Sequence, residues 1–507
     1  MTSTEVEDIL KSFWEWRLRE SPEFATQIGV HTFDNALDDH SLEAYARRQE
    51  DCREFLEKLK AVSLLELSKA DVLNVKLLRN EIETFLDGSK FKGLAAQFIA
   101  LLQEGVRTGH VPPHLTVNRV PDQIMKLLNA AFTDDNLFFK PLKEFPEAFS
   151  EKERESIKER GIKLIEENLK PSFKTIYDYY LNTYLPQSRQ SIACSDLPSG
   201  LSFYNQSLKF HIACELTPNE VHELGQSEVR RIRSRMDEEE LLNGYKKLCD
   251  NKIKPKLKDF FKQIPEADFE IKETPTDLAP VAPGAYYLGP SDDGTRPGVF
   301  MVNTYKPETR PKYEMVSLAL HEAVPGHHLQ TVFAMEQRDQ PSFRRFVEDR
   351  RYYEAPSRFA LHTAYMEGWG LYSEYLGEEM GLYQDPYDLF GRLSNEIFRA
   401  CRLVVDTGMH ALGWSRQKAV DFMVENTAMS LHNVNAEINR YIIWPGQACA
   451  YKVGEIKIKE LRNKTEQKLG EKFDVKDYHH VFLSAGPMGL DTLEEAVDKY
   501  IESTLAI

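Results

Sequence analysis

The chain has 507 residues, of which 42% are hydrophobic and 28% charged, a balance typical of a globular protein. Lys and Arg number 64 against 80 Asp and Glu, and the net charge of −16 argues against a nucleic-acid binder or a partner of anionic membranes. No apolar run reaches the roughly 18 residues that span a bilayer, and the N-terminus lacks the pattern of a secretory signal. The six scattered cysteines form no CxxC pair and are typical of reduced thiols. We therefore expect a cytosolic protein that binds neither nucleic acid nor membrane.

Apolar residues recur at three- and four-residue spacing along most of the chain, which predicts a mainly α-helical fold. Helices are expected at 41–87, 151–182, 218–263, 312–335, 357–380, 386–412, 415–430, 434–443, 449–470 and 491–505. A helix start is predicted at Thr217. Its hydroxyl is the expected cap, Pro218 stands in the first turn, and Glu220 is at the third position. No linker or repeat divides the chain. We expect one unit with an N-terminal half, 1–275, and a catalytic half, 276–507.

A stretch rich in Pro and Gly precedes the most informative motif. It contains two short β-like runs, 285–288 and 298–303, separated by the turn-rich segment GPSDDGTRPG. This pattern predicts a β-hairpin near the motif. We expect the second run to be an exposed strand edge that binds substrate backbone by strand addition, or else a structural cover over the motif.

The motif begins at His321 and Glu322, within HEAVPGHH. A hydrolytic zinc site needs imidazole or carboxylate ligands, an open position for water, and a carboxylate that takes the proton of that water. The helical solution is HExxH, in which histidines four residues apart share a face. Here Pro325 stands at the fourth position, and proline cannot bind zinc.

Two later histidines are alternatives for the second ligand. On a straight helix His328 would lie about 10 Å from His321 along the axis, too far for one ion. Pro325 has no N–H to bond the carbonyl of His321, and Gly326 permits unusual torsions. A bulge there would bring His327 into the second-ligand place. We predict that His327 is the second metal ligand, with His328 as the alternative. The competing interpretation is that these histidines only lie at a helix end beside a Pro-Gly break and bind no metal.

A second acidic element supplies a candidate third ligand. Glu367 and Glu374 are seven residues apart and share a helix face, and Gly368 and Gly370 permit close helix contact. Glu367 could bind the metal while Glu374 supports a ligand histidine. The alternative, a solvated acidic face, fits poorly with the neighbouring Trp369.

Four motifs as a set, HEAVPGHHLQ, EGWGLYSEYLG, RLVVDTGMHALGWS and RYIIWPGQACAYKVGEIKI, resemble the domain-of-unknown-function 885 family of predicted zinc metallopeptidases. The resemblance covers almost the whole chain. It implies a zinc-dependent peptidase.

A more distant resemblance is to the carboxypeptidase Taq and thimet oligopeptidase families. It implies a large helical, zincin-like fold with a deep channel over the metal helix. Their Gly-His-x-Leu is similar to the segment from Gly326 to Leu329, which supports His327 as the second ligand. Their third ligand, a Glu followed seven residues later by another, corresponds to Glu367 and Glu374.

The oxyanion of amide hydrolysis needs a donor besides the metal. The candidate donors are His410, Tyr441 and Tyr451. The alternative for each is a side chain that only packs or forms structural hydrogen bonds. The segment around His410 and the Tyr-x-x-Gly at Tyr451 resemble segments of carboxypeptidase Taq, which implies catalytic roles for these two.

Three cations, Arg402, Arg440 and Lys452, lie in the same motifs. A cation there could hold the terminal carboxylate of a substrate, which favours carboxypeptidase-type cleavage. Ordinary surface cations are the alternative.

The resulting hypothesis is a zinc hydrolase of short peptides, with His321, His327 and Glu367 as ligands and Glu322 as general base. One alternative is a zinc hydrolase of non-peptide amides or amino-acid conjugates, because the same activated water serves both. Another is a helical binding protein that has lost its metal, against which the retained Glu322 argues.

Overall fold

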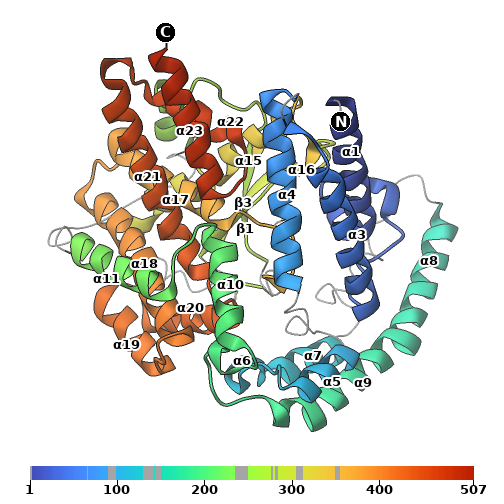
Figure 1. Ribbon diagram of the computed structural model, residues 1–507. Coiled ribbons are helices and arrows are strands. Elements are labelled where there is room, and N and C mark those ends of the chain that lie inside the picture. Colours follow the sequence, from blue (N-terminus) through green and yellow to red (C-terminus); the bar gives the residue numbers. More distant parts are fainter. Residues whose placement is uncertain are drawn as a thin grey trace. The chain divides into compact units, whose positions relative to one another are not determined.

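Helices make up most of the described chain, as the apolar periodicity predicts (Figure 1). The structure, a computed structural model, describes residues 3–64, 67–89, 99–129, 142, 150–233, 249–275, 278–279, 282, 284–303, 312–348 and 354–506. Part of the helix predicted at 218–263 lies outside these residues. The chain divides into two compact units, Met1–Lys92 with Leu201–Ile507, and Gly93–Gly200.

The smaller unit contains α5 (Ile99–Thr108), α6 (His114–Val117), α7 (Val120–Asn129), α8 (Glu151–Leu164) and α9 (Lys170–Tyr179). Leu102, Tyr180 and Tyr184 form a buried apolar cluster within it. The capping box of Ser150 and Glu153 begins α8, because each side chain bonds the backbone N–H of the other.

The larger unit contains the segments that carry the candidate site. Its helices are α1 (Ser3–Glu20), α2 (Pro22–Gln27), α3 (Leu42–Lys60), α4 (Lys69–Ser89), α10 (Gly200–Ile212), α11 (Pro218–Arg233), α13 (Lys254–Phe260), α14 (Met315–Glu322), α15 (His327–Glu336), α16 (Ser342–Arg345), α17 (Thr363–Glu379), α18 (Pro386–His410), α19 (Arg416–Asn426), α20 (Leu431–Ile443), α21 (Ala450–Leu469), α22 (Val475–Ala485) and α23 (Leu490–Leu505). The predicted cap before α11 is confirmed: the Thr217 hydroxyl accepts from the N–H of Glu220 at 3.3 Å.

A small sheet holds β1 (Phe269–Glu273), β2 (Ala285–Leu288) and β3 (Gly298–Val302) in the order β1-β3-β2. The antiparallel pairing of β2 with β3 confirms the predicted hairpin. The expected exposed edge at 298–303 is wrong, because β1 pairs with the other side of β3 and makes it the central strand. Since β1 precedes residue 275 and its partner follows it, the chain does not separate into halves there.

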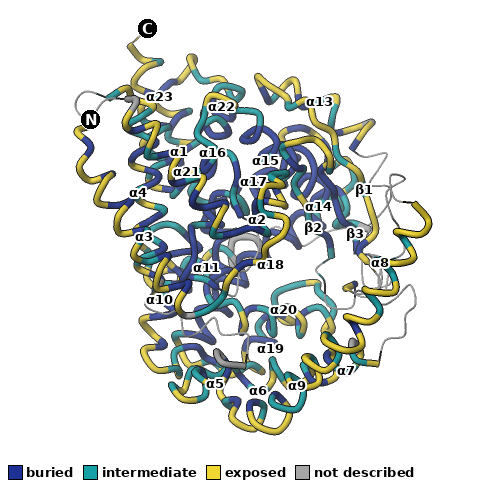
Figure 2. Tube along the Cα trace, turned by 90° about the vertical axis from the view of Figure 1, so that its right-hand side faces the viewer, coloured by how far each residue is buried: buried dark blue, intermediate teal, exposed yellow. Residues whose placement is uncertain are grey.

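The core of the larger unit surrounds α17. This helix packs against α21 and α14, and all but a few of its residues are buried (Figure 2). A Cβ on Gly368 would lie 2.6 Å from the Cα of Gly454, so the two backbones touch and neither position has room for a side chain. No described helix is long and apolar enough to cross a membrane. The six cysteines, all within the described residues, form no disulfide.

Candidate metal centre

A turn interrupts the helical path between α14 and α15. α14 ends at Glu322, a turn with a cis peptide bond before Pro325 follows, and α15 begins at His327. A Cβ on Gly326 would lie 1.8 Å from the carbonyl oxygen of His321, so this close approach requires glycine. Trp369 on α17 donates its indole N–H to the Pro325 carbonyl at 2.8 Å. The predicted bulge is therefore a complete break into two helices.

Three side chains predicted as metal ligands lie together. An oxygen of Glu367 is 3.3 Å from Nε2 of His321 and 3.2 Å from Nε2 of His327. Ligand atoms from the three residues all lie within 4.8 Å of one another. Gly370 leaves space for this arrangement, because a Cβ there would lie 2.7 Å from Nε2 of His321. The cluster combines side chains from α14, α15 and α17.

Glu374 holds the ring of His321 from the side away from the cluster. Its carboxylate lies 2.7 Å from Nδ1 of His321 and accepts a hydrogen bond from the Ser317 hydroxyl. The guanidinium of Arg399 lies 3.6 Å from the same carboxylate. With the proton on Nδ1, the lone pair of Nε2 points into the cluster.

The acid–base properties of the cluster follow from burial and mutual contact. Burial lowers the pKa of His321, but hydrogen bonds with Glu367 and Glu374 outweigh it and raise that pKa to about 9. Burial raises the pKa of Glu367, and the two histidines then bring it well below its usual range. Burial also raises the pKa of Glu322, which is 8% exposed.

His328 points away from the cluster. Its Nε2 donates to the Ala267 carbonyl at 2.9 Å, and its Nδ1 lies 2.8 Å from the hydroxyl of Tyr287 on β2. Burial lowers its pKa to about 4, so the ring is neutral. Because both nitrogens are used, the alternative that made His328 the second ligand is excluded by this geometry.

An alternating stack of rings and cations extends from His321 to α20. The Tyr451 ring stacks on His321 with centroids 6.2 Å apart, and the Arg402 guanidinium lies 3.9 Å from the centre of the Tyr451 ring. Arg402 also lies 5.1 Å from the Tyr441 ring, and Arg440 covers that ring at 5.2 Å. Tyr451 is therefore the candidate oxyanion donor that lies beside the cluster.

Most of the other predicted catalytic and substrate-binding side chains are engaged elsewhere. Arg402 is 2% exposed and supports Tyr451, so it does not face a substrate. Arg440 and the Tyr441 hydroxyl both contact the carboxylate of Glu437. His410 is buried, with Nε2 3.0 Å from the Tyr441 carbonyl.

Lys452 does not fit the predicted role in substrate binding. Its ammonium is buried and pairs with Glu396 at 2.6 Å, Glu228 at 3.2 Å and Glu455. Adjacent residues on a helix point about 100° apart, so Lys452 turns away from the side on which Tyr451 meets His321. The lysine belongs to a buried ion cluster between α11, α18 and α21.

A cavity of about 410 Å³ borders the cluster. Its lining includes His327 and Glu367 together with many apolar side chains and two arginines, Arg296 and Arg345. Sequence reasoning missed the apolar lining residues and the two arginines, because they come from distant segments.

The family model described as "Bacterial protein of unknown function (DUF885)" matches residues 88–247 and 237–497, and the chain belongs to this family. The fold is similar to that of a "putative lipoprotein" from Colwellia psychrerythraea, with a TM-score of 0.86, 22% identity, and coverage of 99% of this chain and 100% of that chain. A "putative lipoprotein of unknown function" from Shewanella oneidensis gives a TM-score of 0.66, 16% identity, and coverage of 97% and 99%. No curated protein matches the sequence. The zincin-like relationship, the deep channel and the cytosolic location stay predictions.

Proposed function

We propose that this protein is a zinc-dependent hydrolase that cleaves amide bonds of short peptides in the cytosol, as an exopeptidase of carboxypeptidase type. The observation that carries the proposal is the convergence of His321, His327 and Glu367 within 4.8 Å, next to the buried carboxylate of Glu322.

The donor set fits a zinc ion. Two imidazoles and one carboxylate are a usual set for catalytic zinc, and they leave a fourth position open. With bonds of about 2.0–2.2 Å, tetrahedral ligand atoms lie roughly 3.3–3.6 Å apart. The Glu367 oxygen is 3.3 and 3.2 Å from the two histidine nitrogens, which is close to this spacing, and all three ligand atoms lie within 4.8 Å of one another.

The chain's own residues would handle the protons. Bound zinc would supply Lewis acidity toward the substrate carbonyl and the attacking water. Glu322 takes the proton of that water and returns it to the leaving amine. Its raised pKa makes it a stronger base than an exposed glutamate. Tyr451, stacked on His321, is the candidate donor to the developing oxyanion.

Metal analysis combined with a mixed peptide library tests the proposal. We expect about one equivalent of zinc after dialysis, and mass spectrometry should find peptides shortened at a consistent end. A protein that retains no zinc and regains none on addition would contradict the metal site. A zinc-loaded protein that cuts no peptide would contradict the substrate class.

Glu374→Gln should weaken zinc binding by about 10- to 100-fold, the usual cost of losing a partner that orients a ligand histidine. The amide keeps the volume of the carboxylate but removes the charge that holds His321. Competition with a chelator gives the affinity. Glu379→Gln is the matched control, because Glu379 lies on the same helix and pairs with Arg462 instead. Unchanged affinity in a folded Glu374→Gln variant would refute the role.

Zinc binding should release protons at neutral pH. The pKa of His321 in the metal-free protein is about 9, so the ring carries a proton below that pH, and a metal ligand must lose it. Affinity should therefore fall as the pH drops from 9 toward 6. Calorimetry at pH 7.5 in buffers of different ionisation enthalpy should show about one proton released or more. A release near zero would contradict the ligand role of His321.

A further inference from the structure

The cavity beside the candidate metal centre follows one face of α15. His327, Gln330, Thr331, Ala334 and Met335 all line it, at the spacing of residues that share a helix face. The eight steps from His327 to Met335 correspond to about 12 Å along the helix axis. The cavity therefore extends from the metal centre to the C-terminal end of α15.

Arg345 is fixed at that far end. Its Nε and Nη2 donate to the Met335 carbonyl at 3.0 and 2.8 Å, and Nη2 lies 3.2 Å from Asp292. Its Nη1 has no hydrogen-bond partner among the described residues, and the side chain lines the cavity. A positioned cation with an available donor is suited to a carboxylate.

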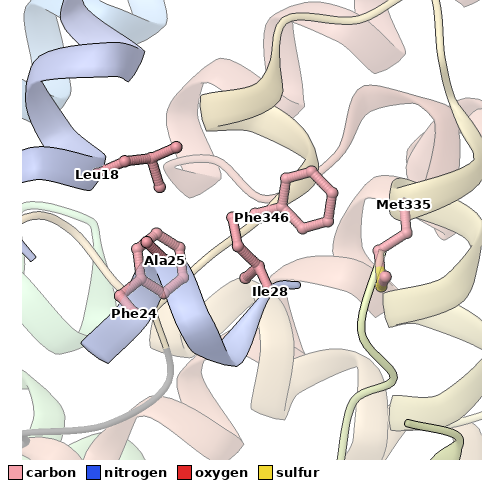
Figure 3. Packing of buried hydrophobic residues seen from close by; sticks show 6 residues of the cluster. All are labelled: Leu18, Phe24, Ala25, Ile28, Met335 and Phe346. Atoms are coloured by element: carbon pink, nitrogen blue, oxygen red, sulfur yellow. The ribbon is translucent and has the colours of Figure 1, made fainter. Parts of the chain in front are cut away.

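The walls between these two ends are mostly apolar. Figure 3 shows Ile28, Met335 and Phe346 close together in one buried cluster, and all three line the cavity. Leu361 and Met366 add further apolar surface. A volume of about 410 Å³ lies within the range of ligand pockets, which combine apolar walls with a few polar anchors.

We propose, on the basis of the function above, that this cavity holds the carboxyl-terminal side of the substrate, with its free carboxylate on Arg345. An extended peptide advances about 3.3–3.6 Å per residue, so about 12 Å accommodates at most three residues. The enzyme then releases apolar di- or tripeptides from the C-terminus of short peptides. A positive anchor selects the carboxyl end, because an N-terminal ammonium would be repelled.

The test compares N-acetylated pentapeptides that end in Ala-Phe-Leu, as free acids and as C-terminal amides. We expect the free acid to bind the Glu322→Gln protein about tenfold or more tightly than the amide. In zinc-loaded wild type, cleavage should fall two or three residues from the C-terminus, with a correspondingly lower KM for the acid. Arg345→Gln should lose the discrimination, and Arg345→Lys should keep part of it.

Arg338→Gln is the matched control. Arg338 pairs with the same Asp292, at 2.6 Å, but does not line the cavity, so the preference for the acid should persist. Equal binding of acid and amide, or a preference that survives Arg345→Gln, would overturn the inference. If wild type cuts neither peptide although the binding preference is present, the proposed hydrolysis fails and the cavity assignment stands.

Discussion

The Glu322→Gln variant should bind zinc as wild type does and lose about 10²- to 10⁴-fold in kcat, the usual contribution of a general base. The amide has nearly the same volume as the buried carboxylate, but it cannot accept a proton from water at neutral pH. Glu322 is not among the three residues whose ligand atoms converge, so the metal should stay. Metal content and peptide turnover on the same preparation give both quantities.

Glu336→Gln is the control for this change. Glu336 ends α15 and accepts a hydrogen bond from the backbone of Glu266 at 3.0 Å, away from the cluster. Its turnover should equal that of wild type. Normal turnover in Glu322→Gln would exclude the proposed base, whereas joint loss of zinc and turnover would assign Glu322 to metal binding.

Glu367→Ala should lower zinc affinity by more than about 100-fold, beyond the effect of removing a supporting partner. The substitution removes one of three ligand atoms and also the negative charge between two imidazoles. Metal analysis after dialysis should find less than about one-tenth of an equivalent, and turnover should disappear with the metal.

Glu379→Gln is again the control, and it should keep the zinc content and the activity of wild type. Circular dichroism checks that Glu367→Ala is folded. A folded variant that still binds one zinc with wild-type affinity would show that Glu367 is not a ligand.

The helical texture and the three residues of the candidate metal cluster could be predicted from the spacing of residues in the sequence. Pro325 and Gly326 predict an interruption of the helix. That interruption makes His327 a better candidate for the second ligand than His328. The form of the break could not be predicted, because the Trp369 hydrogen bond to Pro325 joins segments 44 residues apart. The role suggested for Lys452 followed from its place in a motif, yet helix geometry separates it from its neighbour Tyr451.

The strand β1 and the cavity were beyond sequence reasoning for a different reason. β1 is a short strand with three exposed residues, and its partner β3 lies about 30 residues later in the chain. The cavity walls come from segments near residues 27, 288, 331, 346 and 366, which are brought together by tertiary packing. Each segment alone has the composition of an ordinary core.

One short stretch of α17 organises the whole cluster. Glu367 contributes an oxygen, Trp369 holds the turn before His327, and Gly370 gives His321 its space. Glu374, one turn further on, orients the His321 ring. None of these relations exists until α17 has docked, so an isolated segment containing both histidines should have little affinity for metal. Under the proposed function, the complete ligand set therefore forms only where α14, α15 and α17 have packed together, and the segment around the two histidines does not carry it alone.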